Sequence, residues 1–141
     1  RMTDFQAALG VGQMRRYGDN LNSRQKNANL YIELLSNVSQ ISFTPYSKEN
    51  SYFLFQIILD DKVDRDKIML SLKDEGIGVS IHYATPVPLM SYYKNKYGHS
   101  FKDFPNAVSY GQRVISLPVH PALKAKDIRY ICNKIISMLE N

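Results

Sequence analysis

The sequence predicts an α+β fold: a two-layer small domain, in which helices pack on a sheet of about three strands, preceded by a long helical arm. Three observations predict this fold. Residues 3–38 carry apolar side chains at helical spacing, the middle of the chain holds short runs of β-branched and aromatic residues, and residues 126–140 repeat apolar side chains as a core-facing helix does. Because helices of unequal size separate the strands, we do not expect a regular doubly wound sheet. We divide the chain into a helical arm, residues 1–38, which also serves as an interface segment, and a small α+β domain, residues 39–141.

The composition is that of an ordinary globular chain, with 44% hydrophobic and 22% charged residues. It excludes disordered and collagen-like proteins, and a chain of 141 residues is long enough to bury a core. The longest apolar runs, residues 52–55 and 57–59, fall far short of the roughly 20 residues that a membrane helix needs. Cys132 is the only cysteine and the chain shows no secretory leader, so we expect a cytoplasmic protein. A start at Arg1 within a helical pattern predicts a piece of a longer protein.

The arm is expected to form two helices. Thr3 or Asp4 caps the first, because a short side-chain oxygen accepts hydrogen bonds from the free amides of a first helical turn. Glycine costs about 1 kcal/mol relative to alanine inside a helix, so we place a break near Gly18, with Asp19 or Asn20 capping the second helix. The apolar face of that helix carries Leu21, Ala28, Tyr31, Leu34 and Leu35, with Arg24, Gln25 and Lys26 opposite.

Three segments are predicted to be the strands of the sheet. Residues 51–60 give the strongest strand signal of the chain, since they are rich in aromatic and β-branched side chains. Residues 77–83 alternate apolar and polar positions, and residues 114–117 form a strand that Pro118 ends. Residues 41–43 are shorter and lean only weakly towards β structure.

Two helices are predicted to cover the sheet. Asp64 caps the first, which ends at Gly76, a residue suited to the left-handed position after a helix. The second spans residues 126–140, and Cys132 on its apolar face is interpreted as a buried structural thiol rather than a nucleophile. Between the two helices, prolines make residues 84–112 irregular, with short helices only. The apolar face of the last helix carries Ile128, Ile131, Cys132, Ile135, Ile136 and Leu139.

Several kinds of site are not indicated by the sequence. Gly10-Val11-Gly12 lacks the third glycine and the preceding strand of a dinucleotide-binding fingerprint. The three histidines lie far apart and no Cys–His pair has zinc spacing, so we predict no metal site. The net charge of +5 is mild, and although lysines alternate with tyrosines over residues 92–102, no nucleic-acid-binding motif surrounds them. We therefore predict no nucleic-acid binding.

Two stretches contain candidate binding residues. In residues 80–88, a predicted strand ends in His82 and Tyr83 and continues into a proline-stiffened loop. This pair is either structural, with the tyrosine packed and the histidine bonded to backbone, or it offers a donor and an aromatic face to a polar ligand such as a sugar or a phosphate. In residues 1–10, small side chains allow another element to approach closely, and Arg1 offers a planar fork to an anion.

Three stretches, taken in order, resemble the DegT/DnrJ/EryC1/StrS family of sugar aminotransferases: residues 1–10, 76–86 and 116–127. The resemblance implies the C-terminal domain of a fold-type I aminotransferase that uses pyridoxal 5′-phosphate. Such an enzyme moves an amino group from an amino acid, typically glutamate, to a nucleotide-linked keto sugar, and forms a homodimer. The family's Schiff-base lysine lies in the preceding large domain. The resemblance therefore implies that this chain holds no catalytic residue and is inactive alone.

The resemblance also assigns binding residues. Arg1 matches an arginine that reaches the cofactor phosphate of the partner subunit, and His82 and Tyr83 match a His-Tyr pair that approaches the sugar nucleotide. The sequence departs from the family at Ala84, where many members have proline, and at Pro88, where many have a second histidine. These departures leave the identity of the sugar open.

An alternative function of another class also stays open. The chain would then be a stand-alone α+β ligand-binding or regulatory module without catalysis. His82 and the lysines of residues 94–102 would form its anion site. The reading frame upstream of Arg1 distinguishes this module from part of a longer enzyme.

Overall fold

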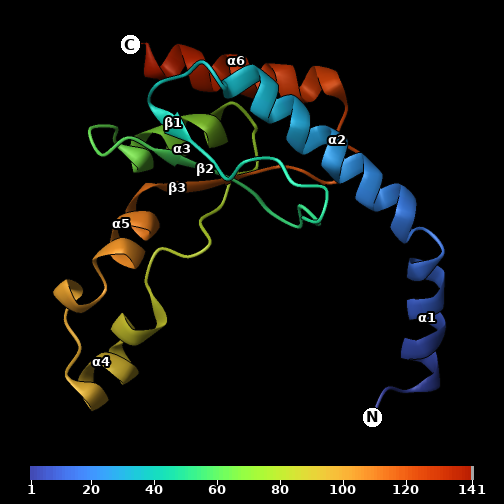
Figure 1. The fold of residues 1–141 in the computed structure, drawn as a ribbon, viewed down its shortest axis with the longest axis horizontal. Helices are drawn as coiled ribbons and strands as arrows, with labels where there is room; N and C mark the ends of the chain where they lie inside the picture. Colours follow the sequence, from blue (N-terminus) through green and yellow to red (C-terminus); the bar gives the residue numbers. More distant parts are fainter. Residues whose placement is uncertain (141) are drawn as a thin grey trace.

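The computed structural model describes residues 1–140 (Figure 1). These residues form helices around one three-stranded antiparallel sheet, in which β2 lies between β1 and β3. The elements in chain order are α1 (Asp4–Met14), α2 (Tyr17–Leu35), β1 (Ile41–Ser42), β2 (Phe55–Leu59), α3 (Arg65–Asp74), η1 (Val87–Leu89), α4 (Ser91–Tyr97), η2 (Phe101–Asp103), α5 (Pro105–Arg113), β3 (Val114–Leu117) and α6 (Ala125–Leu139), where η marks a 3-10 helix.

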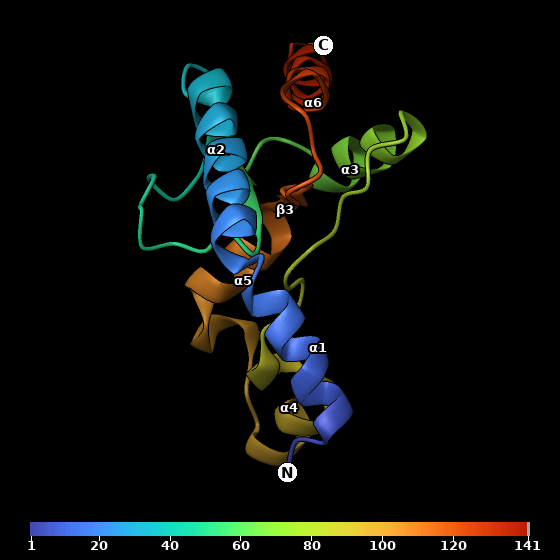
Figure 2. The ribbon, with the colours of Figure 1, turned by 90° about the vertical axis from the view of Figure 1, so that its right-hand side faces the viewer.

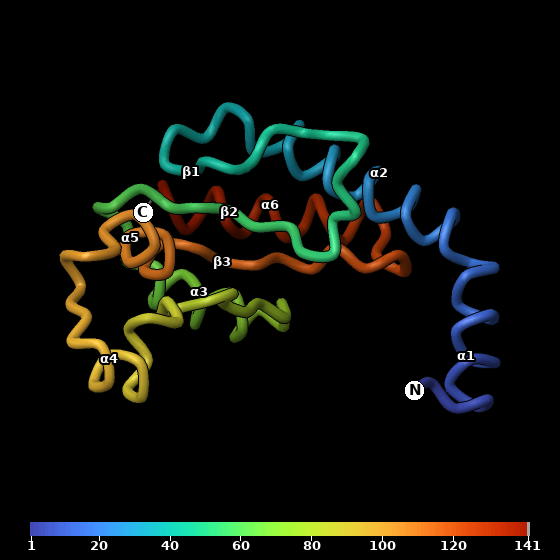
Figure 3. The backbone as a smooth tube through the Cα atoms, turned by 60° about the horizontal axis from the view of Figure 1, so that its bottom comes forward, coloured from blue at the N-terminus to red at the C-terminus, as the bar shows by residue number. Residues whose placement is uncertain are grey.

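The core lies between the sheet and the helices on one of its faces. Helices α2 and α6 run over this face (Figures 1 and 3), and α3 contributes Ile68 and Leu72 to the same cluster of buried side chains. The side chains of β2 alternate, so Phe55, Ile57 and Leu59 point into the core. Tyr31 of α2 stacks on Phe55 with ring centroids 4.9 Å apart. The predicted two-layer α+β fold is therefore confirmed.

The pairing of β2 with β3 gives the sheet a polar row on its other face. Gln56 lies opposite Ser116, and the next pair along, Ile57 with Ile115, faces the core. Because directly opposed residues share a face, Gln56 and Ser116 point together away from the helical layer. Helix α5 contacts β2 on this side through Tyr110, whose hydroxyl donates to Gln56 Oε1 at 2.8 Å.

Residues 77–83 are not the strand that the alternation predicts. They run extended beside β3 but share only one bridge with it, Ser80 with Ser116. Alternation requires only an extended segment with one buried face, whereas a strand also requires successive backbone pairs with a neighbour. Ile77 and Val79 are buried as expected. The third strand of the sheet is instead β1, in the segment with the weaker signal.

Two further boundaries differ from the sequence prediction. Strand β2 starts at Phe55 and not at residue 51, because Tyr52 has a φ of 46° and so interrupts the extended chain. Helix α2 starts at Tyr17 and not after Gly18, and Arg16 precedes it without a side-chain cap. Asp19 therefore lies in the first turn of α2, where its charge favours the helix dipole, and is not the cap.

The predicted caps of the other helices are confirmed. Thr3 Oγ1 accepts a hydrogen bond from the amide of Gln6 at 3.3 Å, and Asp64 Oδ1 accepts one from the amide of Lys67 at 3.0 Å. Gly76 follows α3 with a φ of 75°. Cys132 is fully buried on α6, as the apolar spacing predicts. None of the helices within residues 1–140 combines the length and the hydropathy that crossing a membrane requires.

Two parts of the chain extend away from the sheet. Helix α1 and the region of α4 both point to the side opposite α6, as Figures 1 and 2 show. Helix α2 buries Ala28, Tyr31 and Leu35 in the core, whereas α1 buries no residue. Residues 1–38 therefore contain one helix that belongs to the core and one that projects from it.

Candidate substrate-binding corner at His82 and Tyr83

His82 lies on the polar face of the sheet. Its Nδ1 atom is 2.9 Å from Ser116 Oγ and 3.4 Å from Ser80 Oγ. His82 is half-buried, while Tyr83 is 71% exposed and meets the imidazole edge-on with ring centroids 5.3 Å apart. The peptide bond between them is cis. We call residues 82–84 the His82 corner.

Gln56 links the corner to the sheet. Its Nε2 atom donates to the carbonyl oxygen of His82 at 2.9 Å and, over a longer 3.4 Å, to Ser116 Oγ. Its Oε1 atom accepts from Tyr110, and partial burial raises the pKa of the Tyr110 phenol above its ordinary value. The phenol therefore remains a protonated donor at neutral pH. Gln56, Ser116 and Tyr110 come from β2, β3 and α5, so three elements hold one corner.

Gly111, at the end of α5, lies directly against the corner. A Cβ atom at this position would be 2.5 Å from the carbonyl oxygen of Ala84 and 2.9 Å from that of Tyr83. Both are backbone atoms, so no side chain can move aside to make room. Arg65 of α3 donates to the carbonyl oxygens of Gly111 at 3.1 Å and Val114 at 3.2 Å, which ties this end of α5 to the domain.

The sequence analysis does not identify the three residues that contact the His82 corner: Gln56, Ser116 and Gly111. Gln56 gave a signal, because it is a polar residue inside the most apolar run of the chain. Ser116 gave a similar signal inside the last strand. Gly111 gave none, because its contact with Ala84 joins residues that are close only after the chain has folded.

The structure does not bring Arg1 to this corner within one chain. Arg1 precedes Thr3, the cap of α1, and α1 projects from the far end of α2 (Figure 1). Its side chain is exposed and makes no hydrogen bond or ion pair within residues 1–140. The roles of Arg1, His82 and Tyr83 therefore remain predictions. His82 and Tyr83 lie together in the His82 corner, whereas Arg1 lies apart from them at the start of α1.

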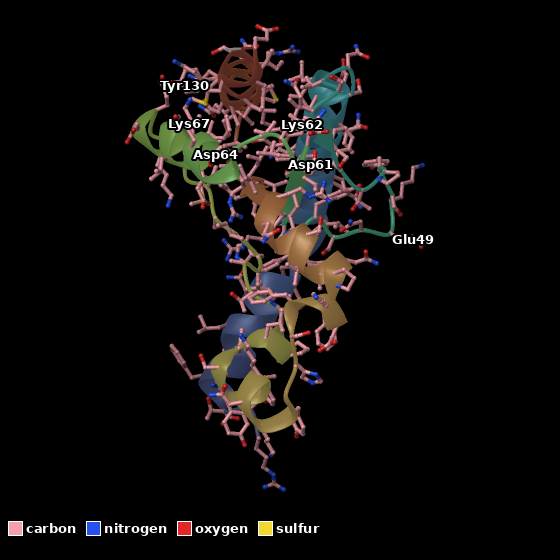
Figure 4. The ribbon with its side chains drawn as sticks, turned by 90° about the vertical axis from the view of Figure 1, so that its left-hand side faces the viewer. Glu49, Asp61, Lys62, Asp64, Lys67 and Tyr130 are labelled. Atoms are coloured by element: carbon pink, nitrogen blue, oxygen red, sulfur yellow. The ribbon has the colours of Figure 1, made fainter. Side chains whose placement is uncertain are left out.

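A hollow of the described surface lies elsewhere. It has a volume of about 780 Å³ and is bordered by the start of α3, the loop before it and the end of α6. Figure 4 shows Lys62, Asp64 and Lys67 together on this side of the molecule. Asp60 and Asp64 accept backbone hydrogen bonds there, and the bond from the Lys62 amide is the main cause that lowers the pKa of Asp60. These carboxylates therefore already hold the turn and the helix start.

The described residues contain no group of three or more His, Cys, Asp or Glu side chains that could hold a metal ion. The lysines among them lie on the surface, except for the half-buried Lys134, whose ammonium pairs with Glu75 at 2.7 Å. Hydrogen bonds from Lys134 and then Tyr130 lower the pKa of Glu75. The side chains of Lys134 and Glu75 are 33% and 37% exposed, so this ion pair is open to solvent.

Comparison with known proteins gives consistent matches. A sequence model described as the DegT/DnrJ/EryC1/StrS aminotransferase family matches residues 1–136. The spore coat polysaccharide biosynthesis protein SpsC of Bacillus subtilis is 34% identical over 134 residues, which are 90% of this chain and 34% of that protein. UDP-4-amino-4,6-dideoxy-N-acetyl-beta-L-altrosamine transaminase of Campylobacter jejuni is 30% identical, over 99% of this chain and 38% of that enzyme.

A solved structure also covers nearly the whole chain. Spr1654 of Streptococcus pneumoniae, a candidate sugar aminotransferase in its PMP-form, superposes with a TM-score of 0.90 and 28% identity over 99% of this chain and 36% of that one. The chain thus spans about a third of the length of the proteins that it matches, and it corresponds to their C-terminal part.

Proposed function

Since the chain belongs to the DegT/DnrJ/EryC1/StrS aminotransferase family, we propose that it is the C-terminal part of a pyridoxal-phosphate-dependent enzyme that aminates a nucleotide-linked keto sugar. The amino group comes from an amino acid, glutamate. The observation that carries this proposal is the family match over residues 1–136, which includes both the arm and the His82 corner. Membership of the family was the expectation from the sequence, and it is confirmed.

The relatives support the substrate class. The Campylobacter jejuni relative is named for the transamination of a UDP-linked amino sugar, and the Bacillus subtilis relative for polysaccharide biosynthesis. A sugar nucleotide offers hydroxyl and phosphoryl oxygens, which suit the imidazole of His82, and apolar ring faces, which suit the exposed ring of Tyr83. We propose these two residues as contacts of the sugar nucleotide.

Pyridoxal phosphate, when bound, supplies the electron sink for amino transfer. Within residues 1–140, the exposed guanidinium of Arg1 fits its phosphate group, because a planar fork can donate two parallel hydrogen bonds. No lysine of these residues fits the aldehyde, because a Schiff-base lysine needs a sheltered site and the lysines here lie on the surface or in the pair with Glu75. We therefore propose that the reactive lysine belongs to another part of the enzyme and that the 141-residue chain alone is inactive.

The first test uses the reading frame that precedes Arg1. We expect it to encode a segment about twice as long as this chain, given that the chain covers 36% of the solved relative. The full-length protein should show a cofactor absorbance band near the visible that disappears on reduction, and should aminate a nucleotide-linked keto sugar with glutamate. The 141-residue chain should show neither. A start codon next to Arg1 would instead favour the stand-alone ligand-binding or regulatory module.

We also propose a cytoplasmic homodimer in which α1 lies at an interface. Its side chains Phe5, Leu9 and Met14 are 74%, 55% and 68% exposed, on a helix that buries nothing. The occupants that we assign to this surface are the remainder of the enzyme and the second subunit. Cys132, buried and unpaired, requires no oxidising compartment.

Self-association of the isolated chain tests the interface. When the rest of the enzyme is missing, the exposed apolar side chains of α1 should make the 141-residue chain self-associate as its concentration rises. Light scattering detects this association. The double variant Phe5→Ser, Leu9→Ser should remain monomeric. Leu70→Ser is the matched control, because Leu70 is 59% exposed on α3 and outside the arm. A clean monomer of the unmodified chain at high concentration would contradict the proposal.

A further inference from the structure

We propose that Gln56, Ser116 and Gly111 are positioning residues that hold His82 with its Nε2 atom as an N–H donor for an oxygen of the sugar nucleotide. This inference rests on the proposed function, since it assumes that the His82 corner contacts that substrate. Three separate contacts carry it: the orientation of the Gln56 amide, the hydroxyl of Ser116, and the packing of Gly111 against the corner.

The orientation of the Gln56 amide is fixed by its partners. The carbonyl oxygen of His82 can only accept, so the atom 2.9 Å from it must be the amide nitrogen of Gln56. The amide oxygen then faces Tyr110, whose hydroxyl donates to it at 2.8 Å. Gln56 thus has one orientation, and its nitrogen also points at Ser116 Oγ, 3.4 Å away.

This orientation determines the role of the Ser116 hydroxyl. Its oxygen accepts from Gln56, so its hydrogen is free to donate, and the acceptor within reach is His82 Nδ1 at 2.9 Å. Ser116 is only 3% exposed, so water competes little for this hydrogen. An imidazole nitrogen that accepts carries no proton, so the proton of neutral His82 is on Nε2.

The Nε2 atom is the part of His82 that is left for a ligand. Within residues 1–140 it has no hydrogen-bond partner, whereas Nδ1 faces two serine hydroxyls. A donor whose other nitrogen is anchored keeps one ring orientation and loses little freedom when it binds. The natural ligand atom for it is an acceptor oxygen, either a phosphoryl or a hydroxyl oxygen of the nucleotide sugar.

Gly111 controls the same corner without any polar group. The missing side chain lets the carbonyl groups of Tyr83 and Ala84 lie against α5, and a methyl group at this position would force them to move. Gly111→Ala therefore displaces the corner while Ser116 and Gln56 stay unchanged. Gly78→Ala is the matched control, since a Cβ at Gly78 meets no atom within 4 Å and its backbone needs no glycine.

The experiment uses the full-length enzyme with its cofactor. In Ser116→Ala, KM for the nucleotide sugar should rise about five-fold or more, as expected for loss of an orienting hydrogen bond. The half-reaction with the amino-acid donor, followed through cofactor absorbance without any sugar, should keep its rate. Gly111→Ala should raise KM at least as much. Two control variants, Ser71→Ala and Gly78→Ala, should keep the KM and the half-reaction rate of the unmodified enzyme. Ser71 is a half-buried helical serine without a side-chain hydrogen bond in residues 1–140.

A second measurement reads the histidine directly. Nitrogen-15 NMR of histidine-labelled enzyme, with the His82 signals assigned by their loss in His82→Gln, should show the proton on Nε2 in the unmodified enzyme. Ser116→Ala should move this equilibrium towards Nδ1. Should Ser116→Ala fail to fold, Gln56→Met, which removes the amide but keeps the side-chain length, provides the same two measurements.

The outcomes separate this inference from the proposed function. An active enzyme in which Ser116→Ala and Gly111→Ala change neither KM nor the position of the proton overturns the positioning role and leaves the function intact. A protein that aminates no nucleotide sugar overturns the function, and the NMR measurement still tests whether Ser116 places the proton of His82. A rise in KM together with an equal loss in the amino-acid half-reaction means general damage, and it counts against the inference.

Discussion

Helices α1 and α6 differ in what covers their apolar side chains. Helix α6 buries Ile128, Ile131, Cys132 and Ile135 against the sheet and α2, while α1 buries none of its residues. Apolar side chains at helical spacing in the sequence predict both helices, with the longer series in α6. The spacing therefore indicates that a helix has an apolar face, but not whether the same chain covers it. An uncovered face on a well-capped helix is what an interface requires.

The largest expected difference between these helices is in stability. Ile135→Ala on α6 should lower the free energy of unfolding of the 141-residue chain by about 2–5 kcal/mol, because it leaves a cavity in a packed core. Leu9→Ala on α1 should change it by no more than about 0.5 kcal/mol. Urea denaturation followed by circular dichroism measures both. Equal losses would mean that α1 packs on the domain in solution.

The second prediction compares the two candidate binding regions in the full-length enzyme. Replacing Arg1 on the arm or His82 in the corner with alanine should each cost about 1–3 kcal/mol of transition-state binding, as for a lost charge-assisted hydrogen bond. Values of kcat/KM for the nucleotide sugar measure this cost. Arg15→Ala, at the other end of α1, is the control. Unchanged turnover with both Arg1 and His82 replaced would remove them from the site.

How far the sequence predicts this protein depends on how local each feature is. The caps Thr3 and Asp64 and the turn at Gly76 act within a few residues, and all three are confirmed. Strand pairing joins distant segments, so the alternation of residues 77–83 led to a strand that the structure does not contain. The pattern shows which side of an extended segment is buried, but not which neighbour it pairs with.

The same limit applies to the candidate site. His82 and Tyr83 drew attention because two side chains with binding chemistry stand next to each other at the start of a proline-rich loop. Their supports, Gln56 and Ser116, lie 26 and 34 positions away from His82, and the β2–β3 pairing together with the Ser80–Ser116 bridge brings them to it. Sequence reasoning could therefore name the corner but not the residues that orient it.

The third prediction uses the buried thiol of α6. Burial raises the pKa of Cys132 from 9.0 to about 12, so the folded chain keeps this proton at a pH where the unfolded chain releases it. The free energy of unfolding should keep the full contribution of this thiol below about pH 9 and decrease as the pH rises towards 12. The thiol alone can lower it by at most about 1.4 kcal/mol per pH unit. Burial raises the pKa of Tyr31 as well and acts in the same direction.

Urea midpoints between pH 7 and 10.5 measure this slope. Cys132→Val removes the contribution of the thiol and should flatten the curve, leaving the part due to Tyr31. A thiol reagent should modify Cys132 in the unfolded chain and not in the folded one. A folded chain that reacts at the rate of a free thiol would show that α6 opens readily, and the contrast with α1 would then be lost.

The smallest effect concerns the helix caps. Thr3→Ala removes the hydroxyl that accepts from Gln6 and should cost α1 about 1 kcal/mol of local helix stability. Because α1 buries nothing, hydrogen exchange of its amides should accelerate while the urea midpoint of the whole chain stays in place. Asp64→Ala removes the equivalent cap of α3, whose Ile68 and Leu72 belong to the core, so the same loss should there lower the global midpoint. One type of substitution would thus be local in one helix and global in the other, and a lower midpoint with Thr3→Ala would show that the arm is already part of the folded domain.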